Sequence, residues 1–137
     1  MSVLVDSTVW SLALRRPRHR LSHAEQRVVA RWTELVQGGS AAIIGLVRQE
    51  VLSGVRDKAL FERIRSILSA FPSEHFTDED HVRAAEFYNR LQSAGVAASP
   101  VDMGLCSVAN RLNIPIFTTD RDFELYARHL PIQLEKS

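Results

Sequence analysis

The sequence of 137 residues has only one cysteine, Cys106, so it cannot form an internal disulfide or a zinc site built on several thiolates. It lacks any apolar run near the roughly 18 residues of a membrane span, and its N-terminus lacks the basic and apolar regions of a secretion signal. These absences predict a cytoplasmic protein with no membrane contact. The length predicts a single domain over residues 1–137, with a core that needs no disulfide or structural metal.

The chain also has almost no excess of charge: it contains 17 Lys and Arg residues and 16 Asp and Glu residues, which gives a formal net charge of +1. The charge is nevertheless distributed unevenly. The segment RRPRHR gathers four arginines: Arg15, Arg16, Arg18 and Arg20. Any polyanionic partner is expected to meet the chain at this segment. A solvated arginine loop and a contact with a protein partner are the alternatives.

Short apolar segments alternate with helical patterns along the chain. The strand candidates are residues 2–5, 40–44, 114–117 and, as an edge strand, 132–134. Capping signals mark the starts of helices between them: Ser7 is placed to cap the first helix, SHAE (22–25) has capping-box spacing, and Thr77 precedes another helix. Helices that alternate with short strands predict an α/β fold around a mostly parallel sheet.

Most acidic residues lie at predicted helix starts or among polar neighbours, where solvation or the helix dipole accounts for them, and Asp80 is one of these. Four acids differ. Asp6 ends the first strand candidate, and Asp120 follows the candidate at 114–117. Glu50 and Asp102 lie inside the apolar stripes of predicted helices.

A carboxylate turned toward a core is costly unless a cation or hydrogen-bond donors compensate it. Ligands of α/β proteins collect beyond the carboxyl ends of parallel strands, where the first and last of these acids are expected. We call the four acids the acidic quartet: Asp6, Glu50, Asp102 and Asp120. Such an oxygen-only cluster suits Mg²⁺ or Mn²⁺ rather than zinc. For any one member, a helix cap or a turn residue is the alternative.

The chain contains four segments in this order: VLVDSTVW, RQEVLSG, SPVDMGLCSVA and IFTTDRDF. Together, at this chain length, they resemble the PIN domain and, within it, the VapC-type toxins of bacterial toxin–antitoxin pairs. The resemblance covers nearly the whole chain. It implies a PIN-like three-layer sandwich, with a sheet of about four to five strands flanked by helices. It also implies that the acidic quartet is the catalytic and metal-binding set, with Asp122 as an accessory acid and Thr8 and Thr118 as hydroxyls that orient carboxylates. The chain departs from the usual pattern at Met103-Gly104, where small residues such as alanine commonly follow the third acid.

The activity implied by the resemblance is that of an endoribonuclease dependent on Mg²⁺ or Mn²⁺. It would hydrolyse phosphodiester bonds in structured RNA such as tRNA or rRNA and so arrest translation. The implied partners are a VapB-type antitoxin and a second copy of the chain, in a homodimer that assembles with the antitoxin. The arginines of RRPRHR would then contact RNA phosphates.

Carboxylate-held ions need no His or Lys base for this chemistry. We expect Asp6 and Asp102 to be the main inner-sphere ligands and Asp120 to bind the same or a second ion. Glu50 is expected to act through a water, as an outer ligand or by orienting the attacking water.

Three other functions remain open from the sequence. A strand-end aspartate accepts a phosphoryl group in receiver domains and aspartate-nucleophile phosphatases, but Thr8 stands where the phosphatases have a second Asp, and no lysine follows the strand at 114–117. A PIN-like binding module without metal is a second alternative. A PIN nuclease that matures RNA without an antitoxin is the third.

Overall fold

The computed structural model describes all residues, 1–137, and places a parallel sheet at the centre of the molecule. The strands run in the order β3-β2-β1-β4, with bounds β1 (Val3–Val5), β2 (Ala41–Ile44), β3 (Ser73–Glu74) and β4 (Ile116–Phe117). Leu4 pairs with Ala42 on one side and with Ile116 on the other. The three residues of β1 are all buried, as expected of a central strand in a parallel sheet.

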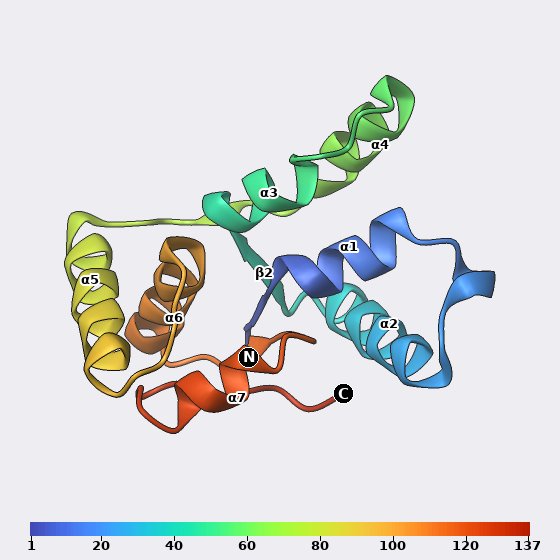
Figure 1. The fold of residues 1–137 in the computed structure, drawn as a ribbon. Coiled ribbons are helices and arrows are strands. Elements are labelled where there is room, and N and C mark those ends of the chain that lie inside the picture. The colour runs from blue at the N-terminus through green and yellow to red at the C-terminus, as the bar shows by residue number, and fades with distance from the viewer.

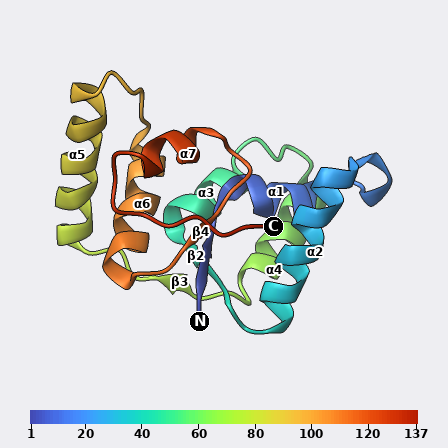
Figure 2. The same cartoon turned by 90° about the horizontal axis from the view of Figure 1, so that it is seen from below.

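Helices connect and cover the strands: α1 (Ser7–Arg15), α2 (His23–Gln37), α3 (Gly45–Leu52), α4 (Lys58–Leu68), α5 (Asp78–Ser93), α6 (Pro100–Leu112) and α7 (Asp122–Ala127). Figures 1 and 2 show α5 and α6 on one side of the strands and α1 and α2 on the other. A short 3-10 helix, η1 (Arg18–Arg20), lies in the connection between α1 and α2. The predicted α/β fold, with a parallel sheet of four strands between helices, is confirmed.

Local capping explains where several helices begin. The side chain of Ser22 accepts a hydrogen bond from the amide of Glu25, and the side chain of Glu25 accepts one from the amide of Ser22. The start of α2 is therefore the predicted capping box. Thr77 caps α5 in the same way. The prediction for Ser7 is wrong, because Asp6 is the N-cap residue of α1 and Ser7 is the first residue of the helix.

The strand bounds differ from expectation at the edges of the sheet. β3 was not predicted, because Ser73–Glu74 has no apolar pattern. The strand expected at 114–117 is shortened, since Asn113 takes a left-handed conformation (φ 55°) and the amide of Ile114 still bonds to the last turn of α6. The expected edge strand at 132–134 is reduced to a single parallel bridge between Leu134 and Ile116.

The buried apolar side chains form one cluster around the sheet. Trp10 lies inside it with no exposed surface, edge-on to Trp32 (5.8 Å between ring centroids) and to Phe71 (5.0 Å). None of the helices has the length and apolar character needed to cross a membrane. The packing of this core thus fixes the ends of β1 and β4, which Asp6 and Asp120 follow.

Candidate functional site

Two members of the acidic quartet, Asp6 and Asp120, lie where the topology predicts, beyond the carboxyl ends of β1 and β4. Asp6 directly follows β1, and Asp120 comes three residues after β4. Glu50 lies on α3, the helix that follows β2, and Asp102 lies in the first turn of α6. Burial is the main cause that raises the pKa of Asp6 and of Asp102; the charge of Glu50 adds to the rise at Asp6, and the charges of Asp6 and Asp120 add to the rise at Asp102. Each carboxylate of the quartet is therefore close enough to at least one other member to be repelled by its charge.

Asp6 is almost fully buried, with 3% of its surface exposed. Its Oδ2 accepts hydrogen bonds from the hydroxyls of Thr118 (2.7 Å) and Thr8 (2.9 Å). Burial raises the pKa of the Asp6 carboxyl above its usual value, although the two threonine hydroxyls lower it in part. Hydroxyls orient this carboxylate, but they bring no positive charge to it.

Asp102 is half-buried, and its Oδ2 accepts a hydrogen bond of 3.0 Å from the hydroxyl of Tyr126. Burial raises the pKa of Asp102 to about 6, and the charges of Asp6 and Asp120 add to the rise, while the Tyr126 hydroxyl opposes it. The folded protein therefore stabilises the ionised form of Asp102 less than water stabilises the ionised form of an exposed aspartate.

Glu50 does not lie inside an apolar stripe as predicted, because it is exposed. The apolar side of α3 is formed by Val47 and Val51, and Glu50 points toward α1 instead. There its Oε1 accepts a short hydrogen bond from the hydroxyl of Ser7, a buried residue. This contact links α3 to the first turn of α1, directly beside Asp6.

Asp120 lies in a tight turn between β4 and α7. Its Oδ1 accepts from the amide of Asp122 (2.9 Å), and its own amide donates to the hydroxyl of Thr118 (3.0 Å). Asp122 is the first residue of α7 and is exposed. The hydroxyl of Thr118 therefore connects the turn that carries Asp120 with the carboxylate of Asp6.

None of the four carboxylates forms a salt bridge with a Lys, Arg or His side chain. No three or more His, Cys, Asp and Glu side chains are arranged to hold one ion as they stand, so coordination by three acids requires side chains to rotate. The chemistry of the donors fits a hard divalent cation, since all are carboxylate oxygens and a buried carboxylate without a cation is costly. Mg²⁺ and Mn²⁺ are the ions that this donor set suits.

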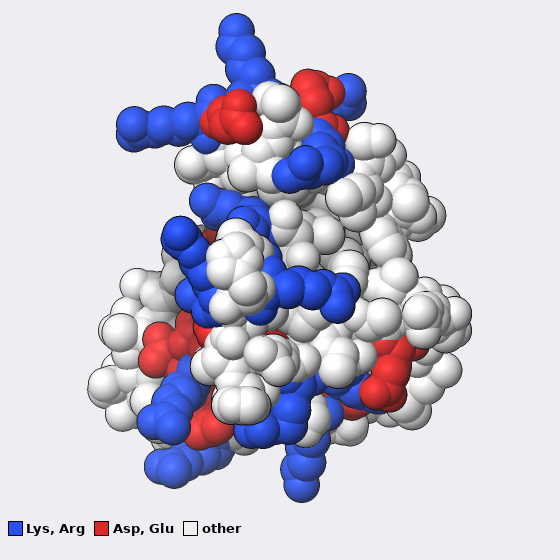
Figure 3. All heavy atoms as spheres, turned by 90° about the vertical axis from the view of Figure 1, so that its right-hand side faces the viewer, with Lys and Arg blue, Asp and Glu red and all other residues white.

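The four predicted RNA-binding arginines lie in the connection between α1 and α2 or at its ends, and all are exposed. Figure 3 shows the face on which this connection lies, with Lys and Arg side chains spread over it and acidic side chains between them. Arg15 and Arg16 line a polar hollow of about 450 Å³ that also includes Thr8 and Thr119, next to Asp6. Arg16 already pairs with Glu25 at 3.0 Å.

Asp80 is buried with no exposed surface, contrary to the expectation of a solvated acid at a helix start. Burial by itself would raise its pKa, but hydrogen bonds from Arg111, the Thr77 amide and Arg83 hold the pKa well below the usual range. Arg111 donates to both carboxylate oxygens, at 2.9 to 3.2 Å. Asp80 thus joins α5 to α6 and lies outside the acidic quartet.

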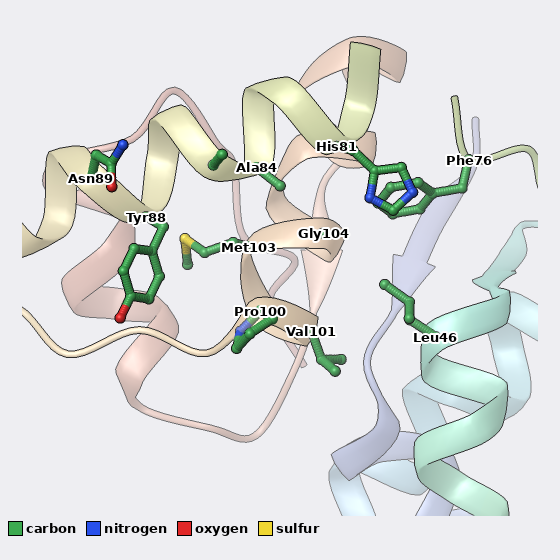
Figure 4. Close-up of a pocket in the computed structure, with 11 residues that line it drawn as sticks. Leu46, Phe76, His81, Ala84, Tyr88, Asn89, Pro100, Val101, Met103 and Gly104 are labelled. Atoms are coloured by element: carbon green, nitrogen blue, oxygen red, sulfur yellow. The ribbon is translucent and has the colours of Figure 1, made fainter. Parts of the chain in front are cut away.

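An apolar groove of about 470 Å³ lies between α3, α5 and α6 (Figure 4), and no member of the acidic quartet lines it. Leu46 and Val101 line this groove and also a smaller hollow that includes Glu50. A side-chain carbon at Gly104 would lie 2.9 Å from Leu46 and 3.2 Å from the ring of Phe76. Glycine at this position therefore allows α6 to approach α3 closely.

Two residues of the site were not predicted in their observed roles. Tyr126 hydrogen-bonds Asp102 across 24 residues of sequence, and Ser7 hydrogen-bonds Glu50 across 43. The sequence pattern marked Ser7 only as a candidate helix cap, and no pattern in the sequence pointed to Tyr126. Both contacts depend on the packing of helices that the sequence pattern alone does not place.

Comparison with known proteins gives one family and a set of similar folds. The sequence model of the PIN domain matches residues 3–129. Two similar structures are FitAcB from Neisseria gonorrhoeae (17% identity, TM-score 0.75, 98% of this chain and 96% of that chain covered) and VapBC2 from Rickettsia felis bound to a DNA fragment from their promoter (18%, 0.74, 98% and 98%). A third is DNA-bound VapBC from Salmonella typhimurium (15%, 0.69, 98% and 97%). At these identities the likeness shows the fold alone.

No curated protein sequence matches the chain significantly. The match to the family model is independent of that result and spans nearly the whole chain, including every member of the acidic quartet. The chain therefore belongs to the PIN domain family, whose members are typically metal-dependent nucleases.

Proposed function

We propose that this protein is a metal-dependent endoribonuclease and the toxin of a type II toxin–antitoxin pair. The observation that carries the proposal is the burial of Asp6 at a strand end with hydroxyl partners and no cationic partner, close to the charges of Glu50 and Asp102. A structural acid is compensated, as Asp80 is by two arginines. The uncompensated charge of the quartet is a feature of sites that bind cations.

Asp6 and Asp102 would be the main ligands of Mg²⁺ or Mn²⁺, and Asp120 would bind the same or a second ion. A divalent ion held by these carboxylates would supply charge stabilisation on the phosphoryl oxygens and a water that is nucleophilic near neutral pH. Thr8 and Thr118 hold the carboxylate of Asp6 by hydrogen bonds at 2.9 and 2.7 Å, so its orientation is set before substrate binds.

Glu50 is suited to hold a water, because it is exposed while the Ser7 hydroxyl fixes its Oε1. In the reaction, a water oxygen would bond to phosphorus as the water gives up a proton to solvent, the bond from phosphorus to the 3′ oxygen would break, and the 3′ oxygen would take up a proton from solvent. The products are a 3′ hydroxyl and a 5′ phosphate. No His or Lys side chain is needed as the base.

Structured RNA, such as tRNA or rRNA, is the proposed substrate. The exposed arginines between α1 and α2 support a polyanionic substrate, and Arg15 lies on the same polar hollow as Thr8, which contacts Asp6. Contacts of this kind bind phosphates and carry no sequence information. The cleavage site would therefore be selected by the shape of the RNA or by other residues.

The proposed partners are a VapB-type antitoxin and a second copy of the chain. The similar structures from Rickettsia felis and Salmonella typhimurium are VapBC complexes bound to DNA, which supports pairing with an antitoxin. A nuclease of RNA maturation would have the same site without such a partner, and an inactive PIN-like module would lack cleavage. The experiment below separates these three functions.

The test is inducible expression of the wild type, Asp6→Asn and Asp102→Asn in a bacterial host, with growth followed and new RNA 5′ ends mapped. We expect the wild type to arrest growth and to cut RNA at defined positions, and each substitution to abolish both effects, because each removes a ligand charge. Asp78→Asn, at an exposed aspartate outside the quartet, is the matched control and should behave as the wild type.

Equal growth arrest by the wild type and both quartet variants would contradict the metal mechanism. Specific cleavage without growth arrest would favour RNA maturation over the toxin. Absence of any new 5′ end in the wild type, with the protein folded and abundant, would favour the inactive module.

A further inference from the structure

Tyr126 is held rigidly beside the acidic quartet. Only 2% of its surface is exposed, and its ring packs edge-on against that of Phe123, with 5.1 Å between the ring centroids. Its backbone carbonyl accepts from the amides of His129 (3.0 Å) and Leu130 (2.8 Å), which close the end of α7. Ring and backbone are both fixed, so the position of the Tyr126 hydroxyl is set by the fold.

That hydroxyl donates to Oδ2 of Asp102 at 3.0 Å. The bond joins α7, which follows the turn of Asp120, to the first turn of α6. The two segments that contribute Asp102 and Asp120 are thereby tied together by a side chain that is not an acid.

The carboxylate of Asp102 has a local alternative that it does not take. Asp102 is the third residue of α6, the position at which Glu25 in α2 and Asp80 in α5 accept from the amide of the N-cap residue at 2.9 Å. In α6 the N-cap hydroxyl of Ser99 accepts from the amide of Asp102 (3.1 Å), but the return bond of a capping box is not formed. The carboxylate instead takes the bond from Tyr126.

We propose that Tyr126 is a positioning residue, which keeps the Asp102 carboxylate at the acidic quartet and out of the capping box of its own helix. The inference rests on the proposed function, because it takes Asp102 to be a ligand of a divalent cation. Partners that hydrogen-bond a metal ligand orient it, and their removal typically lowers metal affinity by about 10- to 100-fold. Without the Tyr126 hydroxyl, the Asp102 carboxylate would turn to the free amide of Ser99.

Binding of Mn²⁺ to purified protein tests this directly, with free Mn²⁺ followed by electron paramagnetic resonance at mildly alkaline pH. Tyr126→Phe removes the hydroxyl and keeps the ring, and we expect it to weaken binding about 10- to 100-fold. The chain has only one other tyrosine, Tyr88, which lines the apolar groove, so Tyr88→Phe is a matched control that should bind as the wild type. Unchanged affinity in Tyr126→Phe, or an equal loss in both variants, overturns the inference and leaves the proposed function standing. A wild type that binds no Mn²⁺ overturns both.

A second measurement covers the case in which Tyr126→Phe does not fold. Protein labelled with 3-fluorotyrosine gives one ¹⁹F signal for each tyrosine, and Tyr88→Phe identifies the signal of Tyr126. Addition of Mg²⁺ is expected to shift the Tyr126 signal, because the Asp102 carboxylate that it contacts becomes a ligand. A Tyr126 signal that stays in place while Mg²⁺ stabilises the protein against heat would overturn the inference.

Discussion

At the scale of single residues, the partner of a buried acid separates the candidate site from the structural framework. Asp6 and Asp80 are similarly buried, with 3% and 0% of their surfaces exposed. Burial raises the pKa of Asp6, whose partners are hydroxyls. At Asp80 the effect of burial is outweighed by hydrogen bonds from Arg111 and other donors, so its pKa falls. The first carboxylate is left available to a cation, and the second is already neutralised.

The raised pKa of Asp102 predicts how stability depends on pH in the absence of metal. A folded-state pKa of about 6, against an ordinary value of 3.8, means that the folded protein binds more protons than the unfolded chain in this window. The free energy of unfolding in chelator should therefore fall as the pH rises through the window. Asp102→Asn should remove this loss and be more stable than the wild type at neutral pH by about 1–2 kcal/mol, a figure reduced for the solvent screening of a half-buried group.

Denaturant unfolding of the two proteins at a series of pH values measures this difference. If the free energy of unfolding changed with pH equally in the wild type and in Asp102→Asn, the pKa of Asp102 would not be raised in the folded protein. Addition of Mn²⁺ should stabilise the wild type and leave Asp102→Asn nearly unchanged, since binding to the folded state alone adds to stability.

At the scale of elements, the pairing of α5 with α6 sets where Asp102 lies. Arg111, near the end of α6, donates to Asp80 in the first turn of α5, and the Ser107 hydroxyl donates to the Asp80 carbonyl at 2.8 Å. These polar contacts fix the two helices along each other. The first turn of α6, with its carboxylate, is positioned as a consequence.

Loss of the Asp80 carboxylate is expected to destabilise the protein strongly. Asp80→Ala leaves two guanidinium groups without their partner and breaks the capping box of α5, so the free energy of unfolding should fall by about 3–5 kcal/mol in urea titrations. Glu62→Ala is the matched control, because Glu62 and Arg65 form an exposed pair on α4. Its loss should be below about 1 kcal/mol. If both variants lowered the free energy of unfolding by the same small amount, the buried Asp80 would stabilise the protein no more than an exposed ion pair does.

At the scale of the whole molecule, a net charge of only +1 includes a local cluster of arginines, Arg15, Arg16, Arg18 and Arg20. Asp6 and Asp120 follow β1 and β4 at one edge of the sheet, and the connection between α1 and α2 carries exposed arginines. Arg15 reaches the polar hollow next to Thr8 and forms no salt bridge, whereas Arg16 is paired with Glu25. Among these arginines, Arg15 is the one we expect to meet a phosphate nearest the site.

Salt dependence of RNA binding tests this placement. In chelator, which prevents cleavage, Arg15→Gln should weaken binding of a single-stranded RNA oligonucleotide at low salt. It should also reduce the slope of log Kd against log salt by about 0.7 for each phosphate contact that is lost. Arg90→Gln, on α5 at the other side of the sheet, should leave the slope unchanged. Equal slopes for Arg15→Gln and the wild type would favour a protein partner for this segment.

Most of the helices, the central strands and their order along the chain were predictable from the amino-acid pattern alone. The apolar segment Val3–Val5 forms the central strand because all its side chains can be buried, and α2 starts at Ser22 because its capping box needs only neighbouring residues. Since parallel strands present their carboxyl ends at one edge, the position of Asp6 and Asp120 relative to the sheet followed from the same pattern.

The contacts between side chains far apart in the sequence became visible only in the folded structure. β3 forms because Ile43 and Ile44 lie beside Ser73–Glu74, and nothing within those two residues signals a strand. The bond from Tyr126 to Asp102, the exposure of Glu50 with its bond from Ser7, and the burial of Asp80 under Arg111 join residues 24 to 43 positions apart. Such contacts depend on how whole helices pack against one another, whereas periodicity and capping report only on neighbours within a few residues of each other.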